Sequence, residues 1–210
     1  MNKLLTSLLT ATALALPLTS QAWVVKQWQV PTGPTSLNDA VNAITSGPAS
    51  FTGAATVIDF TDYAPNTGAF GGTAAWPQAA AAGQTGENAP LNDNFAALIT
   101  GNILVTAADT YWFSTYNDDG LRLRIDGIDV IVDDSLHPAN TRYGSINLSA
   151  GLHSVELVFF ENQGAATLEF AWARGSQTAQ YSLVTSVPEP GSLALAGLAL
   201  LGLGLSRRKA

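Results

Sequence analysis

The second half of the chain consists of short β-type segments separated by glycine-containing turns, and this pattern limits the fold more than any other feature. Tyr111 to Tyr116 is aromatic and β-branched, while Leu121, Leu123 and Ile125 alternate with polar residues, as in a half-buried strand. Strands that recur about every 8 to 12 residues are typical of a sandwich or barrel. We therefore expect an all-β, antiparallel β-sandwich, with further strands at 95–105, 128–132, 144–148, 152–160 and 165–172.

The first part of the domain is predicted to contain one helix and one strand. Ser36 can cap the helix, Asp39 stands three residues later as in a weakened capping box, and Gly47-Pro48 ends it. A strand is expected at 54–60. Residues 64–94 are rich in Ala, Gly, Asn and Pro, which indicates a long irregular connection inside a single domain.

The charge balance restricts the classes of ligand. The chain of 210 residues has 16 acidic and 9 basic residues, a formal net charge of −7, and no cysteine. Four of the basic residues lie near the two ends, so the domain between them is more acidic still. An acidic surface argues against nucleic acid as a partner and suits cation binding. The lack of cysteine excludes disulfides, thiolate metal sites and a cysteine nucleophile.

The N-terminal segment is typical of a secretory signal peptide. Lys3 precedes an apolar run from Leu4 to Leu18, and Ser20-Gln21-Ala22 places small residues where signal peptidase reads them. Residues 1–22 are therefore predicted to be removed after Ala22.

The C-terminal segment has three parts in a fixed order. Pro188-Glu189-Pro190 is followed by an apolar stretch at 192–205 and then by Arg207-Arg208-Lys209. This arrangement resembles the PEP-CTERM sorting signal. As a helix the apolar stretch rises only about 21 Å, less than a hydrocarbon core of roughly 30 Å, so we expect a short transmembrane helix that inserts transiently. The resemblance implies that an exosortase cuts near Pro188-Glu189-Pro190 and releases the protein into an exopolysaccharide-rich envelope.

Between these ends, at 23–186, a spaced set of residues resembles the PA14 domain, the β-sandwich named from protective antigen. The resemblance implies a jelly-roll-like sandwich, and it is closest over 95–174. The residues that carry it are Phe95, Thr100-Gly101, Tyr111-Trp112-Phe113, Asp118-Asp119-Gly120, Leu123, Ile125-Asp126-Gly127, Gly151-Leu152-His153 and Glu161-Asn162.

The PA14 resemblance also implies a metal site. In sugar-binding members, two aspartates joined by a cis peptide bond and a later asparagine hold calcium, and the ion takes sugar hydroxyls; here these positions are Asp118, Asp119 and Asn162. Calcium prefers six to eight oxygen ligands. Adjacent side chains of an extended strand point in opposite directions, so the two carboxylates converge only if the backbone departs from that form. The alternative is that Asp118-Asp119-Gly120 is a tight turn and nothing more.

Other acidic and histidine side chains carry weaker signals. Asp126-Gly127 is predicted to form a type I′ hairpin turn, in which both residues need positive φ. Asp126, Asp129, Asp133 and Asp134 are interpreted as a solvated acidic hairpin in preference to a second cation site. For His153 we expect a packing or edge role, because no nucleophile is near it in the sequence.

Two further features bear on sugar chemistry. Asp118 and Glu161 could form a carboxylate pair for glycoside hydrolysis, but the sequence gives no distance between them. Trp76, Trp112 and Trp172 are interpreted as core residues in preference to sugar platforms, and Trp76, in its Gly/Ala-rich segment, is the one to test for exposure.

Together these features predict a signal peptide (1–22), a PA14-like sandwich (23–186) and a sorting segment (187–210). We expect a secreted, non-enzymatic protein of the extracellular matrix or cell surface, acting as a calcium-dependent carbohydrate-binding or adhesion module that contacts exopolysaccharide or surface glycan. The alternatives are a structural or surface-display domain without a small ligand and, ranked lower, a glycan-active hydrolase.

Processing by signal peptidase and exosortase is the first testable expectation. Mature protein from the native producer should lack residues 1–22 and the basic C-terminal cluster, because both ends match recognition signals. Mass spectrometry of the intact native protein measures this. An uncut C-terminus at Ala210 would contradict it.

Overall fold

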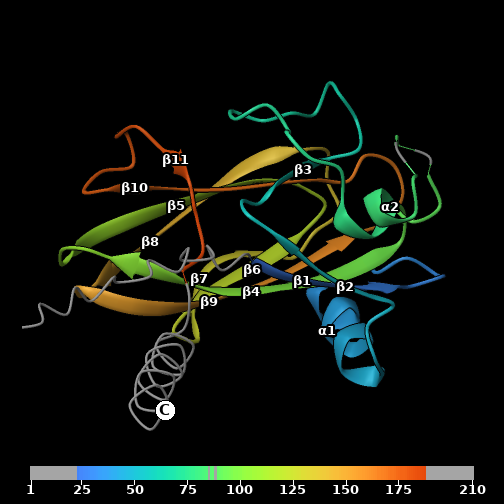
Figure 1. The fold of residues 1–210 in the computed structure, drawn as a ribbon, viewed down its shortest axis with the longest axis horizontal. Helices are drawn as coiled ribbons and strands as arrows, with labels where there is room; N and C mark the ends of the chain where they lie inside the picture. The colour runs from blue at the N-terminus through green and yellow to red at the C-terminus, as the bar shows by residue number, and fades with distance from the viewer. Residues whose placement is uncertain (1–22, 85, 88, 188–210) are drawn as a thin grey trace, which may run out of the picture.

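The computed structural model describes residues 23–84, 86–87 and 89–187 and shows two antiparallel β-sheets packed face to face (Figure 1). The first sheet has the order β2 (Phe51–Ala55), β1 (Trp23–Gln29), β4 (Phe95–Val105), β9 (Gly151–Glu161), β6 (Leu121–Ile125) and β7 (Ile128–Asp133). The second has the order β11 (Ser182–Leu183), β10 (Thr167–Arg174), β5 (Asp109–Asp118) and β8 (Asn140–Leu148), with β3 (Asp59–Thr61) paired to β10. The predicted all-β sandwich is confirmed.

The predicted signal peptide (1–22) and the apolar segment at 192–205 lie outside the described residues. Within the described part of the chain, no helix is both long and apolar enough to cross a membrane.

The core lies between the sheets, and a cluster of aromatic side chains fills one end of it. Alternate residues of β4 and β9 face it, including Phe95 and Phe159. Trp76 is fully buried, and its ring centroid lies 4.8 Å from that of each of these two phenylalanines. The Trp76 Nε1 atom donates to the carbonyl of Ala166 at 3.0 Å. The interpretation of Trp76 as a core residue is therefore confirmed, and the test for exposure is answered: the ring is not available as a sugar platform.

Helix α1 (Leu37–Ser46) begins where the sequence predicts. The Ser36 hydroxyl accepts the backbone N–H of Asp39 at 3.2 Å, and the Asp39 carboxylate accepts the N–H of Thr35 at 2.9 Å, so the capping box is confirmed. The helix packs Leu37 and Ala40 against the outer face of β4 and β9. It therefore covers the sheet close to the ends at which β4 begins and β9 ends (Figure 1).

Several boundaries in the first half differ from the prediction. The single strand expected at 54–60 is divided into β2 and β3, and α2 (Pro77–Ala81) lies within the connection expected to be irregular. Strand β1 was not predicted, because Gln27 interrupts its apolar alternation at a core-facing position. The Gln27 side chain is fully buried there, and its oxygen accepts the backbone N–H of Gln78 at 3.0 Å.

The acidic hairpin is solvated only in part. Asp126 and Gly127 both have positive φ, 51° and 78°, as the type I′ turn requires, and the Asp126 carboxylate binds His153 Nδ1 at 2.6 Å. Asp133 is 6% exposed, and its carboxylate accepts Arg142 Nε at 2.6 Å. The prediction of a solvated Asp133 is wrong, because this side chain turns inward between the sheets and is neutralised by an arginine.

β7 of the first sheet and β8 of the second come into contact, and a glycine permits this contact. A side-chain carbon on Gly144 would overlap the carbonyl oxygen of Val130. Gly144→Ala should therefore destabilise the fold by about 1–3 kcal/mol and lower the melting temperature by several degrees in thermal unfolding.

Gly47→Ala is the matched control for this prediction. Gly47 has an extended φ of 178° and no atom within 4 Å of the added carbon, so its melting temperature should stay near that of the wild type. Equal melting temperatures for the two variants would refute a close approach at Gly144.

Candidate cation site

Three carboxylates meet at one end of the sandwich. Asp118 ends β5, Asp119 follows it, and Glu161 ends β9. One oxygen from each lies within 4.8 Å of the others. The peptide bond between Asp118 and Asp119 is cis, as the PA14 resemblance implies. The structure thus brings the predicted aspartate pair together and adds Glu161. From the sequence, Glu161 was a candidate only for a catalytic carboxylate pair with Asp118.

Backbone amides from two loops hold the aspartate pair. The two Asp119 oxygens accept the N–H groups of His137 at 2.8 Å and Asn162 at 2.9 Å. Asp118 Oδ2 accepts the N–H of Ala139 at 3.1 Å. Each carboxylate oxygen has more than one acceptor position, so these bonds orient the pair and leave acceptor capacity for a cation.

Glu161 is buried without compensation. It follows Phe159 in the row of β9 residues that face the core, and it is fully buried. Neither of its carboxylate oxygens has a hydrogen-bond partner among the residues that the structure describes. Burial, followed by the charges of Asp119 and Asp118, raises the pKa of Glu161 to about 11.

The pKa values of the two neighbouring aspartates are also raised. Burial, followed by the charge of Asp119, raises the pKa of Asp118 to about 6, and burial also raises that of Asp119. A buried carboxylate is costly unless a cation or hydrogen-bond donors compensate it. The three carboxylates supply the hard oxygen ligands that a divalent cation such as calcium prefers, so the cluster can hold a metal ion.

Asn162 lies beside this cluster through its backbone. Its own side-chain Nδ2 donates to the carbonyl of Pro34 at 3.0 Å, in the loop between β1 and α1. An amide nitrogen is a donor, so a cation can be bound only through the Asn162 Oδ1 atom.

The loop that follows β9 is held by acids along its whole length. Besides Asn162 on Asp119, the N–H of Gly164 binds Asp93 Oδ1 at 3.2 Å and the N–H of Ala166 binds Asp62 Oδ1 at 2.9 Å. Burial raises the pKa of Asp62 to about 7 and also raises that of Asp93. This end of the sandwich is therefore acidic beyond the predicted pair.

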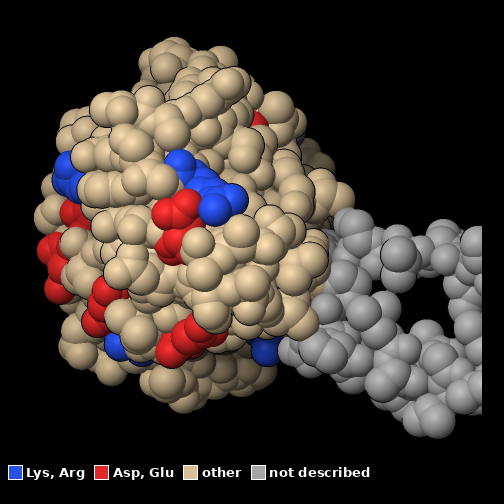
Figure 2. Space-filling model, turned by 90° about the vertical axis from the view of Figure 1, so that its left-hand side faces the viewer, with Lys and Arg blue, Asp and Glu red and all other residues tan. Residues whose placement is uncertain are grey.

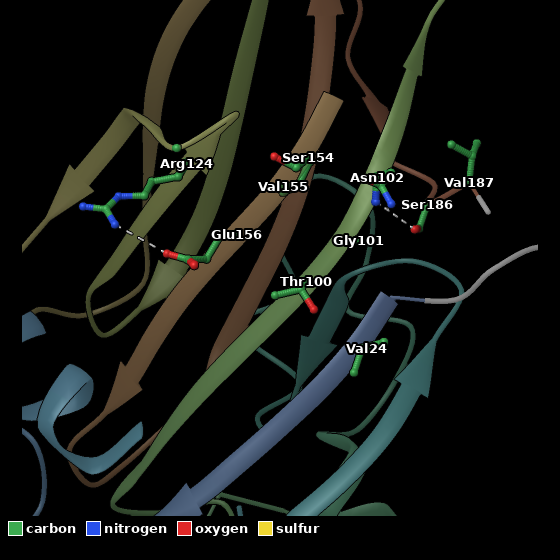
Figure 3. A pocket seen from close by; sticks show the side chains of 11 residues that line it. Val24, Thr100, Gly101, Asn102, Arg124, Ser154, Val155, Glu156, Ser186 and Val187 are labelled. Atoms are coloured by element: carbon green, nitrogen blue, oxygen red, sulfur yellow. Dashed lines mark hydrogen bonds and ion pairs between the residues drawn. The ribbon is translucent and has the colours of Figure 1, made fainter. Parts of the chain in front are cut away.

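A separate hollow of about 420 Å³ lies on the outer face of the first sheet (Figure 3). Several of its polar side chains are already paired. Arg124 lies 3.7 Å from Glu156, and the Ser186 hydroxyl accepts the N–H of Asn102 at 3.3 Å. It contains none of the predicted site residues, and its paired groups offer little to a ligand.

On the face drawn in Figure 2, acidic and basic side chains form small groups, and uncharged surface lies between these groups. This arrangement gives no extended basic patch on this face.

Comparison with known proteins identifies two segments. A family model described as the PA14 domain matches residues 38–183, and one described as the PEP-CTERM protein-sorting motif matches residues 186–209. Among curated proteins, the anti-sigma-I factor RsgI3 of Acetivibrio thermocellus is 29% identical over 86 residues, which are 40% of this chain and 13% of that protein. The chain thus corresponds to only a small part of that relative.

Solved structures share the fold. The PA14 sugar-binding domain from an RTX adhesin has a TM-score of 0.61 at 23% identity, covering 81% of this chain and 100% of that one. The PA14 domain of the antifreeze protein MpAFP also has a TM-score of 0.61, at 14% identity over 84% of this chain and 96% of that one. The A domain of epithelial adhesin 6 from Candida glabrata, solved in complex with Galb1-3GlcNAc, has a TM-score of 0.54 at 12% identity, covering 82% and 87%.

The burial of Glu161 predicts a pH effect in the absence of cations. Its pKa is higher in the folded state, so between about pH 5 and pH 8 the folded chain holds a proton that the unfolded chain has lost. Each such pH unit lowers the free energy of unfolding by about 1.4 kcal/mol. Glu161→Gln removes this loss, so in chelator it should stabilise the chain more at pH 8 than at pH 5, as measured by urea unfolding.

Glu156→Gln is the matched control, because Glu156 lies on the same strand with its side chain 43% exposed. Its difference from the wild type should be nearly equal at the two pH values. A constant difference for Glu161→Gln as well would mean that the Glu161 carboxyl ionises normally in the folded chain.

Proposed function

This chain belongs to the PA14 domain family, and on that basis we propose that it is a secreted, non-enzymatic carbohydrate-binding or adhesion module that acts through a bound calcium ion. The observation that carries the proposal is the cluster of Asp118, Asp119 and Glu161 at one end of the sandwich, three carboxylates that form no ion pair with the described basic residues. The sugar-binding RTX adhesin domain and the Candida adhesin domain that resemble the chain support the choice of ligand.

In the proposed site the ion is held by Asp118, Asp119 and Asn162, with Glu161 beneath it. Glu161 is fully buried, Asp119 is 5% exposed, Asp118 is 9% exposed and Asn162 is more open. Solvent therefore reaches the site from the side of Asn162 and the loops around it. Calcium takes six to eight oxygens, so coordination positions on that side remain for sugar hydroxyls.

The sorting motif at 186–209 sets the proposed destination. Signal peptidase would remove 1–22, the tail would insert transiently into the membrane, and exosortase would cut near Pro188-Glu189-Pro190. The domain would then reach the cell surface or the extracellular matrix, where its glycan partner is exopolysaccharide or a surface glycan.

We include no catalytic step in this proposal. A glycosidase acid must reach the glycosidic oxygen of its substrate, and the two carboxyl groups of a retaining enzyme stand about 5–5.5 Å apart. Asp118 and Glu161 approach each other closely, but Glu161 is fully buried beneath the pair. A carboxyl in that position suits a cation ligand better than a proton donor to sugar.

Calcium should stabilise the folded chain. A ligand that binds only the folded state at a hundredfold excess over its Kd contributes about 2.7 kcal/mol, which corresponds to a rise of roughly 5–10 °C in melting temperature. Asp119→Asn should abolish this rise and Asn162→Ala should reduce it. Thermal unfolding with millimolar calcium and with chelator measures both effects.

Asp109→Asn is the control for this series. Asp109 lies at the opposite end of β5 from Asp118 and pairs with Arg174 on the surface at 2.7 Å, so its calcium response should match that of the wild type. If the wild type melts at one temperature in calcium and in chelator, Asp118-Asp119-Gly120 is a turn without an ion.

Glycan binding should depend on the same ion. In calcium, the protein should bind components of a glycan array or the producer's own exopolysaccharide, and both chelator and Asp119→Asn should remove the binding. Asp109→Asn should bind as the wild type does. Blank arrays and pull-downs from calcium-saturated protein would favour the surface-display alternative, and turnover of glycosides would favour the hydrolase.

A further inference from the structure

A buried histidine lies between two hydrogen-bond acceptors near the beginning of β9, the strand that Glu161 ends. His153 is 7% exposed. Its Nδ1 atom is 2.6 Å from Asp126 Oδ2, and its Nε2 atom is 3.0 Å from the carbonyl oxygen of Ser149. A carbonyl and an ionised carboxylate can only accept, so both ring nitrogens must carry a proton for both bonds to form. The geometry therefore fits the positively charged imidazolium form of His153.

The Asp126 carboxylate joins the β6–β7 turn to β9 through both of its oxygens. While Oδ2 binds His153, Oδ1 accepts the backbone N–H of Ser154 at 2.8 Å and the Ser154 hydroxyl at 3.2 Å. His153 in turn reaches Ser149, which precedes β9. One carboxylate and one imidazole thus connect the β6–β7 turn, the β8–β9 turn and the first residues of β9.

Among the described residues, Asp126 is the one charged group that pairs with His153. On β4 the residue opposite His153 is the apolar Ile103. The other ionisable side chains of the neighbouring strands have partners of their own: Asp109 with Arg174, Arg122 and Arg124 with Asp129 and Glu156, and the Tyr111 hydroxyl with the carbonyl of Ala107. Burial lowers the pKa of His153, but the hydrogen bonds to Asp126 and Ser149 and the charge of Asp126 outweigh it, so the pKa is raised.

This group of residues lies beside the point at which the sorting segment begins. Ser154 pairs across the sheet with Asn102 of β4. The Asn102 carbonyl accepts the N–H of Val187 at 2.8 Å, and the Asn102 N–H donates to the Ser186 hydroxyl at 3.3 Å. Figure 3 shows these four residues around one hollow. Val187 is followed in the sequence by Pro188, so the bonds of Asp126 to β9 stabilise the strand next to the start of the sorting segment.

We propose that His153 and Asp126 form a proton-dependent clamp, closed while His153 is an imidazolium, that holds the β6–β7 turn on β9 beside the start of the sorting segment. When the ring loses a proton, a nitrogen lone pair faces either the carboxylate or the carbonyl, and one bond is lost together with the charge attraction. Because the pKa of His153 is raised in the folded state, the clamp stabilises the fold fully below about pH 6.5. This stabilisation is lost as the pH rises through the folded-state pKa.

Titration of the histidine rings by nuclear magnetic resonance tests the ionic contact. The full chain has two histidines, so the His153 signals are those that disappear in His153→Gln. The pKa of His153 should lie above 6.5 in the wild type and should be lower in Asp126→Asn, which keeps an oxygen for the N–H of Ser154 but has no charge. Asp129→Asn is the matched control, because Asp129 lies on the same hairpin and pairs with Arg124. A wild-type pKa at or below 6.5, or an equal pKa in Asp126→Asn, would overturn the clamp.

Amide hydrogen exchange tests whether this proton holds the turn and the neighbouring strand. At pH 5.5 the N–H groups of Ser154 and Val187 should be about tenfold better protected in the wild type than in Asp126→Asn, and at pH 8 the two proteins should become alike. Both proteins contain Glu161, so its own pH dependence cancels in this comparison. Asp129→Asn should match the wild type at both pH values. A wild type that differs from Asp126→Asn equally at pH 5.5 and pH 8, or at neither, would overturn the proposal.

Discussion

The rest of this site depends on one constraint, a glutamate carboxyl that is buried at the end of a strand and has no ion pair among the described residues. Glu161 is the fourth in a row of alternate β9 residues that face the core. The three before it are apolar: Val155, Leu157 and Phe159. The aspartates beside it raise the cost of ionising it. Burial favours the protonated carboxyl, whereas a cation bound at the proposed site would favour the ionised form and use it as a ligand.

The surroundings of the aspartate pair are built to hold its shape. Asn117 donates from one side-chain nitrogen to the backbone carbonyl of Asp119 at 2.7 Å and to the Asp133 carboxylate at 3.1 Å. Asp133 in turn binds Arg142 and His137. Burial raises the pKa of Asp133, but the hydrogen bonds from Arg142, Asn117 and His137 outweigh it and hold the pKa below its usual value. Asp133 is thus an anion with its own partners, and it leaves Asp118 and Asp119 free for a metal.

The sequence predicted those parts of the molecule whose signals are local. The strand at 95–105, the capping box at Ser36 and the turn at Asp126-Gly127 follow from alternation, capping and the need for positive φ, and all are confirmed. The aspartate pair was found through a motif. Glu161 as a possible ligand was not, because its role depends on facing Asp118 across the gap between the sheets, which no spacing along the chain reveals.

The same reason explains what the sequence left open and what it got wrong. The exposure of Trp76 had to be tested because its segment has the composition of an exposed loop, and its ring packs against Phe95 and Phe159 from distant strands. Asp133 was predicted to be a solvated hairpin end, because the sequence does not show that Arg142 of the neighbouring β8 binds its carboxylate. The most direct test of the account is anomalous diffraction from crystals grown with calcium. We expect a peak about 2.3–2.6 Å from carboxylate oxygens of both Asp118 and Asp119, with Glu161 unprotonated beside it. A well-ordered cluster with water alone at that position would contradict the central claim that this family member works through an ion.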